Sequence, residues 1–88
     1  MSSVLKVVNK LGLHARAASK LVATSKGFGA ELTLEFKGRT VDAKSIMGVM
    51  TLGAPMGSEL TLHANGDDAA AAVQALQALF ADRFGEAE

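Results

Sequence analysis

Polar and apolar side chains alternate through residues 31–43, and this pattern restricts the fold more than any other feature of the sequence. Successive side chains of a β-strand point to opposite faces, so strict alternation predicts a strand with one buried face over Glu31–Phe36. Lys37-Gly38 predicts a tight turn, and Arg39–Ala43 continues the alternation as the second strand of a hairpin. The side chains expected in the core are Leu32, Leu34, Phe36, Val41 and Ala43.

Two further segments predict strands that complete a sheet with this hairpin. Val4–Val8 is rich in β-branched residues and is expected to bury Leu5 and Val7. Leu60–Ala64 alternates as well, and Asn65-Gly66 after it is typical of a turn that requires positive φ. The outward strand positions carry Glu, Thr and His, so one face of the sheet should be solvated.

Helical spacing of apolar residues predicts a helix over Ala15–Lys26, and Gly27 stands where a left-handed C-terminal cap is expected. A long Ala-rich helix should begin at a cap formed by Asp67 or Asp68 and end at Gly85, with a frayed tail over Glu86–Glu88. Its expected buried stripe consists of Val73, Leu76 and Phe80.

A short apolar helix is predicted between the third and fourth strands, over Ser45–Met50, with Ser45 as its N-cap. Ile46, Val49 and Met50 share one face of this helix, whereas Met47 should be exposed.

The predicted element order is β-α-β-β-α-β-α. With 88 residues, of which 49% are hydrophobic, the chain can form one small core, so we expect one domain over residues 1–88. The expected fold is an α/β (α+β) open-faced β-sandwich, in which three helices cover one face of a four-stranded antiparallel sheet.

Composition argues against several classes of function. The 9 Lys and Arg residues balance 9 Asp and Glu residues, so the broad basic field typical of nucleic-acid binders is missing. Without cysteine, and with two histidines far apart in sequence, no metal site is expected, and no cofactor is implied. No apolar run reaches the length of a membrane span, and the first residues do not resemble a signal peptide, so we expect a cytoplasmic protein without membrane insertion.

His14 stands where a loop becomes a helix, a position that Ser, Thr, Asp or Asn usually fills. The imidazole would lie beside the unpaired backbone amides of Ala15, Arg16 and Ala17, at the positive end of the helix dipole. This arrangement predicts an anion site, to which the Arg16 guanidinium adds a fork that suits phosphate oxygens. The plainer alternative is an ordinary loop histidine; His63, on an outward strand position, is expected to be plain surface.

Two separated motifs resemble one known family. Gly12-Leu13-His14-Ala15-Arg16-Ala17-Ala18 is similar to the phosphohistidine signature of the HPr family, the phosphocarriers of the bacterial phosphoenolpyruvate-dependent phosphotransferase system. Lys44-Ser45-Ile46-Met47-Gly48-Val49-Met50 resembles the regulatory serine segment of that family. The one visible departure is Ala17, where the family usually has proline; alanine should preserve the first helical turn.

The resemblance implies roles for particular residues. His14 would be phosphorylated at Nδ1 by phospho-enzyme I and would pass the phosphoryl group to sugar-specific or regulatory components of the system, with Arg16 contacting it. Ser45 would be the target of the ATP-dependent HPr kinase/phosphorylase. Ile46, Met47 and Met50 would border the surface on which partners dock. The chain would then be a monomeric protein substrate rather than an enzyme, with strand order 1-4-2-3.

Two alternatives belong to other classes. A βαββαβ effector-binding module would use Gly12–Arg16 only to hold a small anion, and a regulatory HPr paralogue would signal through Ser45. The presence of His14 weakens the second alternative. An RNA-binding domain is disfavoured because the outward strand face lacks aromatic stacking platforms.

Overall fold

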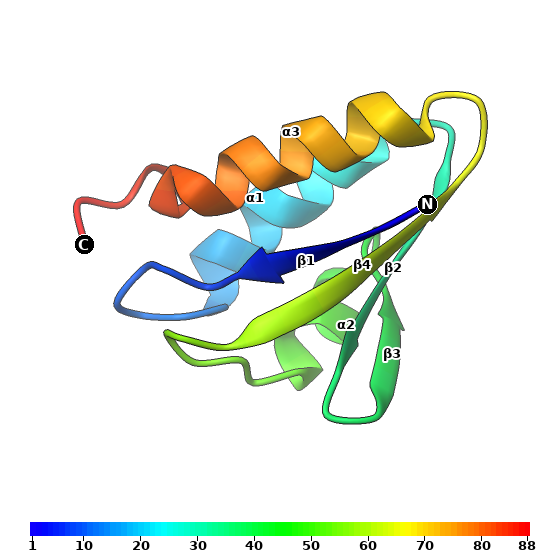
Figure 1. The fold of residues 1–88 in the computed structure, drawn as a ribbon. Coiled ribbons are helices and arrows are strands. Elements are labelled where there is room, and N and C mark those ends of the chain that lie inside the picture. Colours follow the sequence, from blue (N-terminus) through cyan, green and yellow to red (C-terminus); the bar gives the residue numbers. More distant parts are fainter.

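The computed structural model describes residues 1–88 as a four-stranded sheet with helices on one face (Figure 1). The elements, in chain order, are β1 (Ser2–Lys6), α1 (Ala15–Lys26), β2 (Glu31–Phe36), β3 (Arg39–Asp42), α2 (Ile46–Thr51), β4 (Glu59–Asn65), α3 (Ala69–Ala81) and a 3₁₀ turn, η1 (Arg83–Gly85). None of the helices has the length and apolar character needed to cross a membrane.

The sheet has the strand order β1-β4-β2-β3, and every neighbouring pair is antiparallel. In the central pair, Leu34 lies opposite Leu62 and Thr33 lies opposite His63, so the register places apolar residues on one face and polar residues on the other. This confirms the predicted open-faced sandwich and its strand order.

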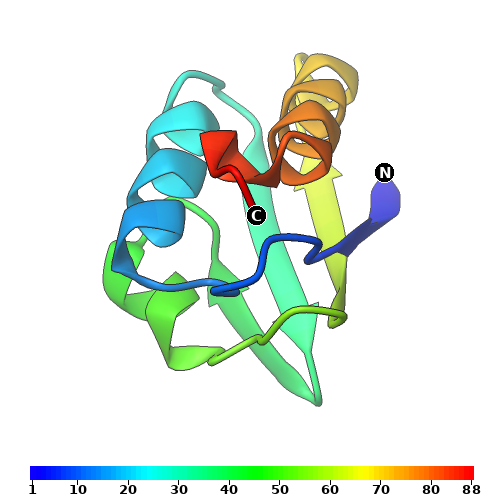
Figure 2. The same ribbon diagram turned by 90° about the vertical axis from the view of Figure 1, so that its left-hand side faces the viewer.

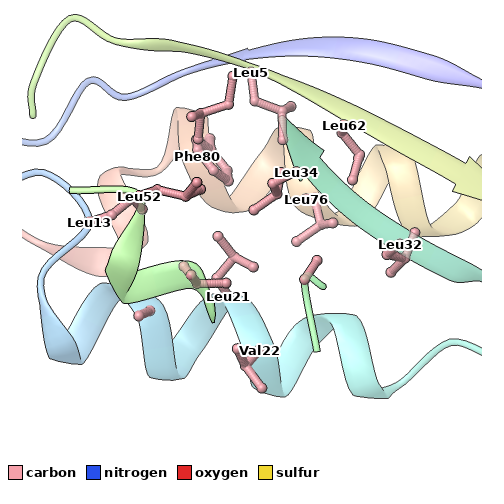
Figure 3. Packing of buried hydrophobic residues seen from close by; sticks show 14 of the residues in the cluster. Leu5, Leu13, Leu21, Val22, Leu32, Leu34, Leu52, Leu62, Leu76 and Phe80 are labelled. Atoms are coloured by element: carbon pink, nitrogen blue, oxygen red, sulfur yellow. The ribbon is translucent and has the colours of Figure 1, made fainter. Parts of the chain in front are cut away.

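One core fills the space between the sheet and the helices. Leu34 and Leu62 point from the sheet towards Leu21 of α1 and Leu76 of α3 (Figure 3), and all four side chains are fully buried. The predicted stripe of α3 is buried as expected. Phe36 and Val41, by contrast, are only partly buried, because β3 is an edge strand and β2 ends beside it.

The bounds predicted for α1 and β2 are confirmed, but other element ends differ from the predictions. Gly27 has φ −72° and ψ −7°, a right-handed conformation, so it is not a left-handed cap. The chain leaves α1 instead through a tight turn in which the amides of Gly27 and Phe28 donate to the carbonyls of Thr24 and Ser25. β1 ends at Lys6, two residues earlier than predicted, and the Val7 amide bonds to the loop carbonyl of Ser58.

Asp68 occupies the N-cap position of α3, but its carboxylate does not cap that helix. Its two oxygens accept the amides of Gly29 and Ala30, each at 2.8 Å, and thereby tie the start of α3 to the segment that leads into β2. These amides, with a contribution from the charge of Lys44, hold the pKa of Asp68 below its ordinary value.

The C-terminal end of the chain was predicted incorrectly. The α-helix ends at Ala81 rather than at Gly85, and Arg83, Phe84 and Gly85 follow with φ of 57°, 54° and 79°. The Phe84 ring is fully buried, with its centre 4.8 Å from that of Phe80. The tail is not frayed: residues 86–88 turn back to the loop between β1 and α1 (Figures 1 and 2), where the Lys10 amide donates to the Glu88 carbonyl.

Candidate functional site at the N-terminus of α1

His14 is the N-cap residue of α1, as predicted, and its side chain makes no capping hydrogen bond. The first intrahelical bond runs from the Ala18 amide to the His14 carbonyl at 2.8 Å. The amides of Ala15, Arg16 and Ala17 therefore precede the first helical bond, as the anion-site prediction requires. Ala15 and Arg16 are exposed, whereas Ala17 is buried.

The loop before His14 is held in one shape by its neighbours. Gly12 has φ 70°, and a Cβ atom at this position would lie 2.6 Å from the Ala54 carbonyl oxygen, so only glycine fits. The Leu13 amide donates to the same Ala54 carbonyl at 3.0 Å. The segment after α2 thus supports the loop that carries His14.

Glu86 is the residue of this site that sequence reasoning missed. Its side chain, only 13% exposed, is hydrogen-bonded through one carboxylate oxygen to His14 Nε2. The other oxygen accepts Asn9 Nδ2 at 3.0 Å. Burial raises the pKa of Glu86. The hydrogen bonds from His14 and Asn9, with the nearby charges of His14 and Arg16, lower it by a larger amount, so the net shift of the pKa is downward. No periodicity or motif marks an acidic residue near a chain end, so the sequence offered no signal for it.

A surface hollow of about 330 Å³ opens beside His14. Its lining combines basic and acidic side chains with two apolar residues: Lys10, Leu11, His14, Arg16, Glu86, Ala87 and Glu88. The His14 side chain is 28% exposed, so a partner can reach the imidazole from outside. A group bound here would meet the ring, the guanidinium of Arg16 and the open helix end together.

The second predicted motif lies on α2, which packs against α1. Ser45 caps α2 as predicted, because its Oγ accepts the Gly48 amide at 3.1 Å. Met47 is 73% exposed, in agreement with prediction, and Val49 is fully buried. Ile46 and Met50 were expected to share the face of Val49, but they are 41% and 39% exposed, because a helix of six residues buries only a narrow side. Ile46, Met47 and Met50 therefore form an exposed apolar surface on α2.

His63 is a half-buried strand residue that faces the solvated side of the sheet, as predicted, and its Nε2 bonds to Glu35 at 3.0 Å. It lies on the solvated face of the sheet, whereas His14 lies at the helical layer. The structure therefore does not bring the two histidines into one site.

The fold and the site define a class of small open-faced sandwiches with a partly accessible histidine beside the free amides of the first helix. A family model described as "PTS HPr component phosphorylation site" matches residues 1–82. The chain belongs to the HPr family and is a phosphocarrier of the phosphotransferase system, not a stand-alone enzyme. This excludes the effector-binding module considered from the sequence.

Relatives and solved structures agree on this family. Phosphocarrier protein HPr of Cupriavidus necator is 52% identical over 82 residues, which cover 93% of this chain and 92% of that protein. HPr of Xylella fastidiosa strain Temecula1 is 54% identical over 82 residues, which again cover 93% of this chain and 92% of that protein. The crystal structure of HPr from Thermoanaerobacter tengcongensis covers 100% of this chain and 99% of its own, with a TM-score of 0.95 at 40% identity.

Proposed function

We propose that His14 accepts the phosphoryl group at Nδ1 from phospho-enzyme I and donates it to downstream acceptor proteins of the phosphotransferase system. The observation that carries the proposal is the position of His14, a partly exposed imidazole at a helix N-terminus whose first three amides precede any helical bond. A surface histidine suits a carrier that several proteins must reach. The protein would act as a monomer of one domain in the cytoplasm, where these partners would meet it.

The chemistry needs a nucleophile and donors for the phosphoryl oxygens. The lone pair of His14 Nδ1 forms the new N–P bond, while the bond between phosphorus and the donor breaks and leaves its electron pair on the donor. The amides of Ala15, Arg16 and Ala17 would hold the phosphoryl oxygens, as helix N-termini do for other anions. The Arg16 guanidinium would neutralise charge on the transferring group.

Ser45 and the exposed apolar surface of α2 supply the proposed regulation and docking. Ile46, Met47 and Met50 would contact enzyme I and the acceptors, since exposed apolar side chains that cluster mark interaction sites. Where the cell contains an HPr kinase/phosphorylase, Ser45 would receive its phosphate. That anion would lie at the N-terminus of α2 and within the docking surface, where it would weaken the encounter with acidic or apolar partner groups.

Phosphorylation of purified variants tests the assignment of His14. The protein is incubated with phosphoenolpyruvate and enzyme I, and acid-labile phosphate is measured. His14→Ala should fold normally and accept no phosphoryl group. Arg16→Ala should be phosphorylated more slowly, because the backbone donors remain. His63→Ala is the matched control, since it removes the other histidine, which is also partly accessible, and should react like the wild type. Acid-labile phosphate on His14→Ala, or its loss in His63→Ala, would refute the assignment.

A further inference from the structure

We infer that Glu86 is a positioning residue for phosphoryl transfer: its carboxylate holds the His14 ring with the proton on Nε2, so that Nδ1 presents its lone pair. The inference rests on the proposed function of His14. It adds a role for the C-terminal tail, in which Glu86 acts through the His14 ring.

The hydrogen bonds around Glu86 determine which ring nitrogen carries the proton. An ionised carboxylate only accepts hydrogen bonds, so the His14 nitrogen that contacts it must donate, and this nitrogen is Nε2. The lowered pKa of Glu86 agrees with an ionised carboxylate at neutral pH. In a neutral imidazole the other nitrogen is then free of a proton. The contact therefore selects the tautomer in which Nδ1 is the nucleophile.

The carboxylate is itself held in place. Its second oxygen accepts Asn9 Nδ2, and the same Nδ2 donates to the Gly12 carbonyl at 2.8 Å, two residues before His14. Asn9 is fully buried, so this connection is sheltered from water. Loop, carboxylate and imidazole thus form one network, in which a shift of Glu86 would release the ring.

An unusual backbone turn brings Glu86 to this position. Arg83 and Phe84 both have positive φ, a conformation that residues other than glycine rarely adopt, and Gly85 follows in the same region. The buried Phe84 ring holds the turn in the core, and Lys20 Nζ of α1 donates to the Phe84 carbonyl at 2.6 Å. The turn reverses the chain after α3 and directs the next residue to His14. The strained residues Arg83 and Phe84 thus lie just before Glu86, where they set the direction in which the chain approaches His14.

The chain beyond Glu86 is also attached. The Lys10 amide donates to the Glu88 carbonyl at 3.0 Å, and the Lys10 ammonium lies 3.3 Å from the Glu88 carboxylate. Glu86 is therefore fixed by the Phe84 turn before it and by the Lys10 contact after it. The Glu88 side chain is 71% exposed, so its ion pair is expected to contribute little.

Charge adds to orientation during the transfer. When Nδ1 forms its bond to phosphorus, the ring keeps its Nε2 proton and becomes cationic. The Glu86 carboxylate lies against that proton and stabilises the positive charge as it develops. No proton needs to move during this step.

Three variants test the role of Glu86. The fraction of neutral His14 with its proton on Nε2 is measured from ring ¹⁵N chemical shifts, and kcat and KM are measured for phosphoryl transfer from enzyme I. Glu86→Ala should lower the Nε2–H fraction and slow transfer about 5- to 10-fold, as expected for the loss of a charge-assisted hydrogen bond. The loss should fall on kcat, because little of the Glu86 side chain is exposed to a partner. Glu86→Gln should be intermediate, since its single amide oxygen can serve either His14 or Asn9. Glu88→Ala is the comparison within the same hollow: it should leave the Nε2–H fraction at the wild-type value, because the Glu88 side chain contacts Lys10 and not the His14 ring.

The outcomes separate this inference from the proposed function. If wild-type His14 accepts no phosphoryl group, the proposed function fails. If His14 is phosphorylated but Glu86→Ala leaves both the tautomer fraction and kcat unchanged, the positioning role is refuted while the carrier function stands. If Glu88→Ala slows transfer as much as Glu86→Ala, the tail acts through its overall attachment and the specific role of Glu86 is also refuted.

Discussion

Restoring proline at residue 17 tests the geometry of the helix start on which the anion site depends. Ala17 is the third residue of α1, and its amide precedes the first helical hydrogen bond, which Ala18 donates. Ala17→Pro therefore removes no intrahelical bond. The residue before a proline is disfavoured in helical conformation, but a first helical turn commonly accommodates the pair. The buried Cβ position is kept, and the added ring carbons lie on the side of the former N–H.

The expected gain comes from the unfolded chain. A proline whose native conformation is unstrained stabilises a protein by about 0.4 to 1 kcal/mol, because the unfolded state has fewer conformations to lose. For a domain of this size that gain raises Tm by about 2 to 8 °C. With ordinary urea dependence it also raises the unfolding midpoint by about 0.2 to 1 M. The Ala17 amide is lost as a phosphate donor, so we expect transfer from enzyme I to slow by no more than about tenfold, the loss of one hydrogen bond.

Urea titration followed by circular dichroism measures the stability, and a phosphorylation time course measures the transfer. A loss of about 2 kcal/mol or more would indicate that residue 17 donates a helical hydrogen bond. In that case α1 would begin earlier than Ala15, and His14 would not be its N-cap. The anion-site reasoning would then fail. A much larger drop in transfer at unchanged stability would instead identify the Ala17 amide as the principal phosphate donor.

Four further variants probe the second motif, the C-terminal turn and the Asp68 contact. Ser45→Ala should lower the free energy of unfolding by about 1 kcal/mol, because the Gly48 amide loses its cap. Ser45→Asp should retain the cap yet slow phosphoryl transfer to His14 at low ionic strength. Unchanged transfer kinetics would place Ser45 outside the docking surface. Phe84→Ala should destabilise the fold by about 3 to 5 kcal/mol in urea, because its ring is fully buried; a loss below about 1 kcal/mol would contradict its role as an anchor. The pKa of Asp68 is lowered in the folded state, so its contribution to stability is present above the ordinary value of 3.8 and is lost as the pH falls through the lower folded-state pKa. Asp68→Ala should therefore be less stable than the wild type at neutral pH and approach it in acid, and a difference independent of pH would argue against the carboxylate contact.

Local patterns in the sequence were sufficient wherever a segment meets the core directly. The alternation of Glu31–Phe36 and the spacing of Ala15–Lys26 reflect which side chains are buried, and both sets of bounds match the structure. Ser45 was predicted as an N-cap from its side-chain chemistry, whereas His14 was placed at the start of α1 by the helical spacing that follows it. The shared face of Ile46, Val49 and Met50 did not show which of them is buried, since helical periodicity gives direction but not the width of the covering surface.

Contacts between distant segments were decided only by the tertiary structure. Asp68 follows the local rule for an N-cap, yet the amides of Gly29 and Ala30, nearly forty residues away, take its carboxylate.

At the proposed phosphorylation site, the position of His14 follows from local sequence, whereas the position of Glu86 depends on contacts between distant segments. The sequence by itself determined the sheet, the principal helices and the position of His14, because burial period and capping chemistry act over a few residues. The partner of that histidine lies 72 residues further along the chain. Its placement depends on where α3 ends, on the Phe84 ring filling the core and on the turn that follows. Such contacts follow from how finished elements pack, and no short stretch of sequence encodes them.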